Sequence, residues 1–272
     1  MRVSIIGEVL TNITKIFLDF SFTSVINFVS RLGEFINNKR QLEFLAMAGV
    51  FDKFQNNRAI IHDSASNLLM ISQTINRDIN SKQKSLFYNR PSEEEFYYLL
   101  KKSPLWPTNI LFLNEYNSLG FFTSGTPLHE EQKYFKDFKL ATSQDVVNNR
   151  INGKTFEILG FLVKYEERIV NNSKFLDLHF IDSKGTFNVS IFKEKLEELN
   201  IILKEGLSYI SVVNHSMDRE HRMRLRLRSL KDCRKLMKNN VKKSKIYLKD
   251  SKSLNELKEI LQKCEKGETE II

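Results

Sequence analysis

The residues best suited to molecular recognition are Gln83–Phe87, with the sequence QKSLF. A glutamine, two intervening residues and an adjacent leucine–phenylalanine pair supply one hydrogen-bonding anchor and two large apolar side chains. Burying Leu86 and Phe87 in a partner's groove contributes about 1.5–3 kcal/mol each, enough for a weak and reversible contact. The flanking residues are too polar for a core element. The pattern therefore predicts either a docking peptide or a surface loop whose two apolar side chains fold back onto the protein.

A second group suited to binding lies further along the chain, where arginine alternates with apolar residues from position 222 to 228. In a β-strand, this alternation places the guanidinium groups on one face, about 6.6 Å apart. Like charges at this spacing repel one another unless something anionic lies across them. The pattern indicates either a nucleic-acid surface or a face neutralised by nearby acids. The arginines are Arg222, Arg224, Arg226 and Arg228, and the acids are Asp218, Glu220 and those of Glu194–Glu198.

Residues for catalysis form no recognisable pattern. The sequence has no glycine-rich phosphate loop, no GxSxG and no HExxH. Asp177, His179 and Asp182 are the nearest approach to a cluster, and Asp182 is better explained as a turn residue. Paired carboxylates for two-metal phosphoryl transfer are not visible as a compact motif. We therefore expect no catalytic residue, no metal site and no cofactor in this chain acting alone.

The composition favours a folded, basic protein. The 272 residues are 41% hydrophobic and 28% charged, and 42 Lys and Arg against 33 Asp and Glu give a net charge of +9. Such an excess favours polyanionic partners, nucleic acid before membrane. Cys233 and Cys264 lie far apart, which indicates a reducing compartment and no structural zinc. Met1–Phe20 carries charges at intervals and no other run is long enough to span a membrane. We expect a cytoplasmic protein.

Two kinds of element are predicted to position these residues, beginning with helices. Up to residue 120 the apolar residues recur at helical spacing. Thr23–Ser24 and Asn37–Asn38 are suitable N-caps for two short helices, and Gly49 is a suitable stop for the second. Pro107 suits a first helical position. The other expected helices cover 4–20, 57–75, a short segment from residue 92, and 108–118.

From residue 154 the apolar pattern changes to period two, which is typical of strands. Strands are expected over 156–165, 174–181, 186–192, 207–214 and 221–230, with a short helix over 194–199. Five strands with a helix between the third and fourth predict an OB-fold β-barrel. A strand–helix–strand segment over 245–272 follows and cannot bury its own apolar face. The fold class is therefore α+β in several parts: a small helical module, the barrel and a truncated β-α-β tail.

Taken in order, these parts resemble the C-terminal portion of the bacterial DNA polymerase III alpha subunit. The resemblance is carried by Phe22–Arg31 with Ile36–Asp52, and by Glu115–Leu128, whose sequence is EYNSLGFFTSGTPL. In that family an internal sliding-clamp-binding peptide of Gln-x-x-Leu-Phe type lies between these two motifs, where Gln83–Phe87 stands. The resemblance covers nearly the whole chain.

The resemblance implies a domain organisation. Residues 1–75 are a helical module, 76–92 a linker with the clamp-binding peptide, 93–150 a helical connector and 151–232 an OB-fold domain. Residues 233–272 are a truncated segment similar to the part that contacts the tau subunit of the clamp loader. The chain departs from the family in lacking the phosphoesterase-like domain, the catalytic palm and the fingers. It also has Thr126 where the family has histidine, and only Gly7 remains of the helix-hairpin-helix glycines.

The resulting prediction is a non-catalytic part of a replicative polymerase. It binds the sliding clamp, the beta subunit, through Gln83, Leu86 and Phe87. The barrel guides single-stranded DNA through Arg222, Arg224, Arg226, Arg228, Lys174 and Phe175. Two alternatives stay open: one half of a split polymerase that is active with a separately encoded catalytic chain, and a free-standing OB-fold single-strand binder.

Overall fold

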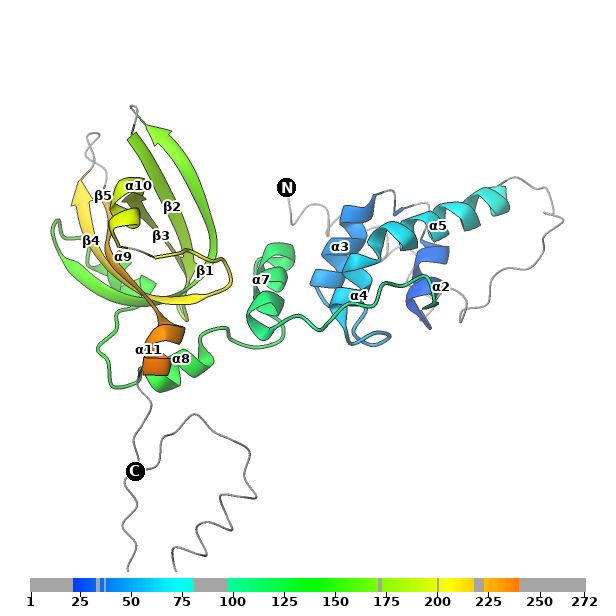
Figure 1. Cartoon of the computed structure of the whole chain (residues 1–272), viewed down its shortest axis with the longest axis horizontal. Helices are drawn as coiled ribbons and strands as arrows, with labels where there is room; N and C mark the ends of the chain where they lie inside the picture. Colours follow the sequence, from blue (N-terminus) through cyan, green and yellow to red (C-terminus); the bar gives the residue numbers. More distant parts are fainter. Residues whose placement is uncertain are drawn as a thin grey trace, which may run out of the picture. The chain divides into compact units, whose positions relative to one another are not determined.

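The computed structural model describes residues 22–32, 35–36, 38–80, 97–170, 173–199, 201–217 and 223–239. The expected helices over 4–20 and from residue 92, the Gln83–Phe87 peptide and the 245–272 segment lie outside the described residues. The rest forms two compact units. Helices α2, α3, α4, α5 and α7 make up the helical unit, and strands β1–β5 with α8–α11 make up the sheet unit (Figure 1). Two short stretches, 162–165 and 203–207, group with the helical unit.

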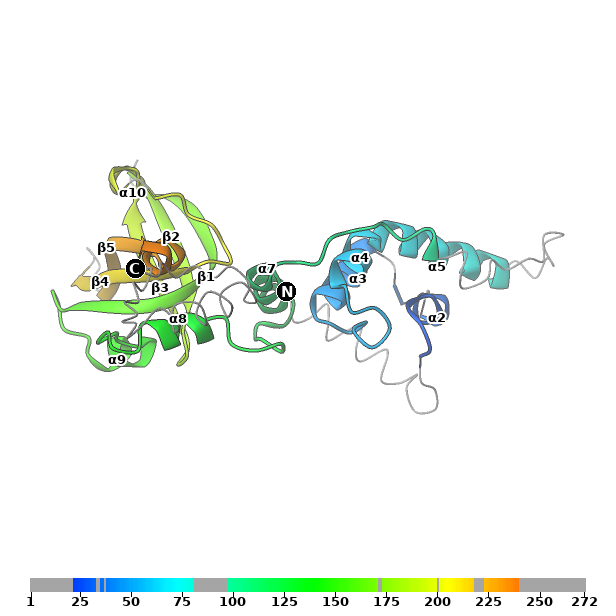
Figure 2. The ribbon, with the colours of Figure 1, turned by 60° about the horizontal axis from the view of Figure 1, so that its bottom comes forward.

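The helical unit contains α2 (Val25–Arg31), α3 (Lys39–Met47), α4 (Arg58–Asp63), α5 (Ala65–Asn80) and α7 (Thr108–Leu119), shown in Figure 2. The hydroxyl of Ser24 accepts a hydrogen bond from the backbone N–H of Asn27, which caps α2. Asn38 and Gln41 form a reciprocal capping box at the start of α3. Gly49 follows α3 at a φ of 79°, which suits glycine. The predicted caps and stop are confirmed.

The core of the helical unit is contributed by α2, α3, α4 and α5 together. The Phe28 and Phe51 rings meet edge to face with centroids 5.0 Å apart, a favourable aromatic arrangement. None of the helices in the described ranges is long and apolar enough to cross a membrane. The buried cluster comprises Val25, Ile26, Phe28, Val29, Leu32, Ile36, Leu42, Leu45, Ala46, Phe51, Ile61, Ala65, Leu68 and Ile71.

One helix was expected over 57–75, and that prediction is wrong: α4 and α5 are separate helices with Ser64 between them. The Ser64 hydroxyl accepts a hydrogen bond from the backbone N–H of Lys101 at 2.8 Å. This junction is thus in contact with a segment far along the chain, which apolar spacing does not reveal. Pro107 precedes α7 as its N-cap instead of starting it, and α7 ends at Gly120 as predicted.

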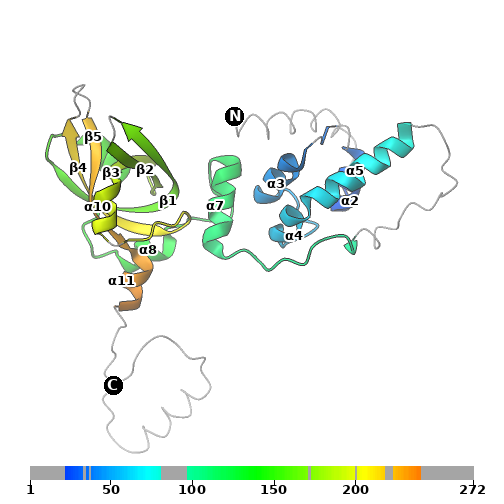
Figure 3. The same ribbon diagram turned by 45° about the horizontal axis from the view of Figure 1, so that its top comes forward.

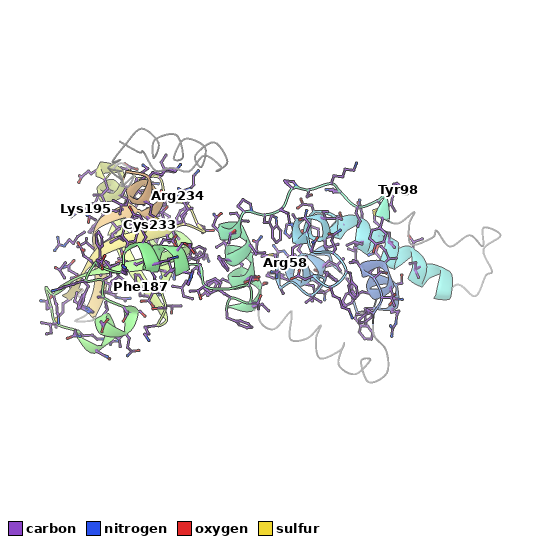
Figure 4. The ribbon with its side chains drawn as sticks, turned by 90° about the horizontal axis from the view of Figure 1, so that it is seen from below. Arg58, Tyr98, Phe187, Lys195, Cys233 and Arg234 are labelled. Carbon is purple, nitrogen blue, oxygen red and sulfur yellow. The ribbon has the colours of Figure 1, made fainter. Side chains whose placement is uncertain are left out.

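A buried, ionised carboxylate explains much of the Glu115–Leu128 motif. Glu115 lies on α7 with its side chain fully buried. It accepts hydrogen bonds from the backbone N–H groups of Thr123 and Ser124 (2.9 and 3.1 Å) and from their hydroxyls (2.7 and 2.5 Å). The guanidinium of Arg58, labelled in Figure 4, donates to Glu115 at 2.8 Å and to Asp52 at 2.7 Å. We call these five residues the Glu115 cluster.

The sheet unit is built on β1 (Thr155–Val170), β2 (Ser173–Ile181), β3 (Thr186–Phe192), β4 (Ser208–Met217) and β5 (Met223–Asp232). The five strands close on themselves in the order β1-β2-β3-β5-β4 (Figure 3). Pairing is antiparallel between β1 and β4, β2 and β3, and β4 and β5, and parallel between β3 and β5. The five predicted strands are confirmed, although β1 is longer than expected.

Four short helices accompany the sheet: α8 (His129–Tyr134), α9 (Ser143–Asn148), α10 (Lys193–Glu198) and α11 (Cys233–Asn239). Only α10, between β3 and β4, was predicted. Cys233, labelled in Figure 4, begins α11 and is buried. Burial raises the pKa of its thiol to about 12, so Cys233 stays protonated at neutral pH.

The closed sheet depends on a close approach at Gly160 in β1. A methyl group added there would lie 2.8 Å from Cζ of Phe187 and 3.1 Å from Cβ of Phe180. The two phenylalanine rings stack with centroids 5.2 Å apart. They belong to β2 and β3, so the glycine allows β1 to pass close to that pair. The buried hydrophobic residues of the strands are Phe156, Ile158, Leu159, Phe161, Leu162, Val163, Leu176, Leu178, Phe180, Phe187, Val189, Ile191, Tyr209, Ile210, Val213, Leu227 and Leu230.

Gly160→Ala is expected to destabilise the sheet unit by about 1–3 kcal/mol, because the added methyl group forces the two rings apart. Hydrogen exchange of β1–β5 peptides, measured by mass spectrometry, should show the loss of protection. Trp106, the single tryptophan, lies in the helical unit, so its unfolding transition is the internal control. The Phe187→Leu substitution should lower the free energy of unfolding of the sheet unit less in the Gly160→Ala variant than in the wild type, because the smaller side chain relieves the clash with the added methyl group. Unchanged strand protection in Gly160→Ala would contradict the steric argument.

Glu115→Gln is expected to destabilise the helical unit by about 3–5 kcal/mol, because Arg58 loses a buried partner and an amide cannot accept every bond. Urea unfolding followed by Trp106 fluorescence measures this loss. Glu43→Gln is the matched control: it removes only the partly exposed ion pair with Lys39 and should change stability by less than about 1 kcal/mol. Equal effects of the two substitutions would contradict a structural role for the Glu115 cluster.

The same cluster predicts a pH dependence. Burial disfavours the charge on Glu115, but the hydrogen bonds from Ser124 and Thr123 outweigh burial and lower its pKa from 4.5 to about 2. The stabilisation is therefore complete above the unfolded-state pKa near 4.5 and is lost as the pH falls towards 2. The free energy of unfolding of the helical unit should decline over this window in the wild type. Glu115→Gln should lack that component of the decline.

Candidate nucleic-acid interface

The outward face of β2 and β3 carries a pair of aromatic rings. Side chains alternate in both strands between the buried interior and the outside. Phe175 and Phe192 are direct cross-strand partners on the outside. Their ring centroids lie 4.2 Å apart with the planes tilted by 38°. Phe192 is 41% exposed, which is high for a large apolar side chain. We call Phe175 and Phe192 the aromatic pair.

Arg226 from β5 lies over this pair. Strand β5 runs parallel to β3, and Ser190 is the residue paired with Arg226. The guanidinium carbon of Arg226 is 5.4 Å from the Phe175 centroid and 5.8 Å from the Phe192 centroid. Both distances are within the range of a cation–π contact. Two of the predicted binding residues, Phe175 and Arg226, are thus brought together from strands that are distant in sequence.

The remaining arginines depart from simple alternation. Val213 pairs with Leu227 but Val212 pairs with Ser229, so Arg228 is an extra residue in a β-bulge. The strict period-two prediction is therefore wrong beyond Leu227. The side chain of Arg228 nevertheless lies on the same face of the sheet as Arg226. Its Nε donates a hydrogen bond at 2.9 Å to Oδ1 of Asn214, and Asn214 is the β4 residue that pairs with Arg226. Arg224 is exposed, and Arg222 lies outside the described residues.

Acidic residues occupy part of the same region. Asp177, two residues after Phe175 in β2, forms an ion pair with Arg168 at 3.0 Å. Lys174, a predicted binding residue, lies 3.9 Å from Glu167. Lys193 donates to Glu167 at 2.8 Å, and that bond lowers the pKa of the Glu167 carboxyl. The charge available to an anionic ligand is therefore greater around Arg226 than around Lys174.

The nearest approach to a catalytic or metal cluster, Asp177, His179 and Asp182, is not one site. Asp177 pairs with Arg168, and a ring nitrogen of His179 lies 2.9 Å from the Asn188 side chain. Asp182 accepts hydrogen bonds from the backbone N–H groups of Lys184 and Gly185, which closes the β2–β3 turn. Asp182 thus shapes the turn as predicted. Within the described ranges no three His, Cys, Asp or Glu residues are grouped so that they could hold a metal ion.

Sequence reasoning missed Phe192. The signal for it was present, because Phe187 to Phe192 alternate and counting outward from the Asp182–Gly185 turn pairs Phe192 with Phe175. The clamp-binding prediction, Gln83, Leu86 and Phe87, falls outside the described residues. It stays a prediction.

Comparison with known proteins shows that the chain is similar to part of the DNA polymerase III alpha subunit. It is 26% identical over 238 residues to the DNA polymerase III subunit alpha of Rickettsia bellii, with 87% of this chain and 20% of that protein covered. The subunit of Caulobacter vibrioides is 27% identical over 187 residues, with 68% and 16% covered. That of Borreliella burgdorferi is 25% identical over 257 residues, with 90% and 22% covered. No family model matches the chain.

The resemblance to the DNA polymerase III alpha subunit is thereby confirmed, and the chain is related to a part of that protein. It spans about a fifth of the length of the relatives it matches. Among solved structures, yeast Stn1 and Ten1 give a TM-score of 0.25 at 14% identity, covering 49% of this chain and 78% of that one. RecG bound to a three-way DNA junction gives 0.26 at 10% identity, covering 76% and 30%.

Proposed function

We propose that this chain is the part of a DNA polymerase III alpha subunit that holds single-stranded DNA on an OB-fold and docks on the sliding clamp. The sequence relationship supports a role connected with the replicative polymerase. The OB-fold assignment is supported by the number of strands, their closure and the position of α10 between β3 and β4. The face of strands 2 and 3 is the usual oligonucleotide-binding surface of that fold.

The observation that carries the DNA-binding proposal is the position of Arg226 beside the aromatic pair on this face. A cation next to one exposed and one half-buried ring suits a strand that has both phosphates and unpaired bases. Arg224 and Arg228 extend the positive charge along β5. The ligand is a single strand, and the affinity falls steeply with salt because phosphate contacts release counterions.

The clamp contact rests on the Gln83–Phe87 motif and its place between the two family motifs. A weak peptide contact and a weak DNA contact on the same chain give a higher overall avidity than either alone. The domain boundaries given above, a cytoplasmic location and a tau contact by residues 233–272 belong to the same proposal.

Two other functions give different outcomes in the same assays. A free-standing OB-fold binder captures oligonucleotides but no clamp. One half of a split polymerase extends a primer when it is mixed with the catalytic chain encoded beside it. Primer extension by that mixture, but by neither chain alone, would favour the split polymerase.

Reversing Arg224 and Arg226 to Glu is expected to weaken binding of a labelled oligo-dT chain at low salt by at least about tenfold, because two phosphate contacts become repulsive. The slope of log affinity against log salt should become shallower by about 0.7 for each lost contact. Fluorescence anisotropy titrations at several salt concentrations measure both. Arg40→Glu with Lys53→Glu, two exposed residues of the helical unit, gives the same change in net charge. Equal weakening by both pairs would mean that only overall charge matters.

Replacing Leu86 and Phe87 with Ala is expected to abolish capture of purified sliding clamp, because the two apolar side chains supply most of the contact energy. A pull-down with the full chain measures it. Met70→Ala with Leu105→Ala removes two apolar side chains that are 65% and 71% exposed and should leave capture intact. Undiminished clamp binding by the Leu86 and Phe87 variant would refute the tether.

A further inference from the structure

We propose that the aromatic pair, Phe175 and Phe192, is a stacking site for one unpaired nucleobase, with Arg226 bound to the adjoining phosphate. The inference rests on the proposed single-strand binding and adds which part of the strand this face recognises. It assigns Phe192 a binding role, with the two rings contacting the base and the guanidinium contacting the phosphate.

The geometry of the pair suits one base. Phe192 is 41% exposed because it belongs to the outward-facing set of β3, whose alternate residues are buried. Phe175 supports it from β2, with the ring centroids 4.2 Å apart, so a base stacked on Phe192 meets a surface held firmly from behind. The sheet fixes both Cα positions, because Phe175 and Phe192 are register partners in the β2–β3 ladder. Little conformational entropy is then lost when a base binds.

Arg226 supplies the second half of the site. Its guanidinium carbon lies within 6 Å of both centroids, close enough to contact a nucleotide stacked on either ring. A guanidinium pairs well with a phosphate because its planar fork offers parallel N–H donors. Asp177, an acid on this face, forms its ion pair with Arg168. Arg226 is the cation that contacts both rings among the described residues.

This site requires bases that are not already stacked. In duplex DNA the ring faces of the bases are covered by their neighbours, so the aromatic pair has no base face to stack on and only the nearby positive charge attracts a duplex. In a single strand every base offers a ring face, and stacking on an aromatic side chain tolerates any sequence. Rings and charge together therefore favour a single strand without selecting its sequence.

The test distinguishes binding to the bases from binding to the phosphates. One probe is a labelled oligo-dT chain, and the other is an abasic chain of the same length with the same phosphates. The full-length protein should bind the dT chain at least about fivefold more tightly, since one stacked base contributes about 1–3 kcal/mol. Phe192→Leu and Phe175→Leu should each reduce that ratio towards one while leaving abasic binding unchanged. Arg226→Gln should weaken both probes. Phe138→Leu, at a 52% exposed ring elsewhere in the sheet unit, should change neither.

Each other outcome is decisive. Equal wild-type affinity for the two probes would overturn the stacking site while leaving single-strand binding by charge intact. Equal weakening of both probes by Phe192→Leu would also overturn it, because the ring would then serve only the fold. Binding of neither probe by the wild type would overturn the proposed function together with this inference.

Discussion

The close approach of β1 to the Phe180–Phe187 stack is the constraint on which the sheet unit depends. Phe180 and Phe187 are buried inside the closed sheet and stack on each other there. Gly160 is the residue that leaves room for them, since a side chain there would lie within 3.1 Å of both. Closure in turn brings β5 beside β3. Because β5 lies beside β3, Arg226 lies near the ring pair from β2 and β3.

The parts of the fold that sequence predicts well are those specified by local chemistry. The β2–β3 hairpin is an example, because Asp182 binds the backbone of its own turn and period-two burial leaves one register. Helix starts at Ser24 and Asn38 are also local, since each cap bonds a residue three positions on. Such features can be predicted because the residues that form each hydrogen bond lie within a few positions of one another in the sequence.

The parts that sequence does not reveal depend on distant contacts. Ser64 separates α4 from α5, and its hydroxyl accepts a hydrogen bond from Lys101, 37 residues further on. The bulge at Arg228 lies in the pairing of β5 with β4, and the alternation of arginine with apolar residues does not predict it. The candidate site combines both cases. Phe175 and Arg226 were recognised by type, whereas their convergence follows from parallel pairing of β3 with β5, which no short pattern specifies.

The Glu115 cluster shows how a motif can be structural and still bear on function. Its donors come from the residues that follow α7, so the carboxylate holds the chain in a fixed path after Gly120. Arg58 ties this path to α4. The Glu115–Leu128 motif, which carries part of the resemblance to the DNA polymerase III alpha subunit, is therefore explained by a buried charge and its hydrogen bonds. A ligand has to be sought at the surface, and on the sheet unit the exposed ring of Phe192 is held in a fixed position beside the half-buried Phe175 and Arg226. The proposed clamp tether and the proposed stacking site are complementary, because the first would set how long the chain stays near DNA and the second which part of the DNA it holds.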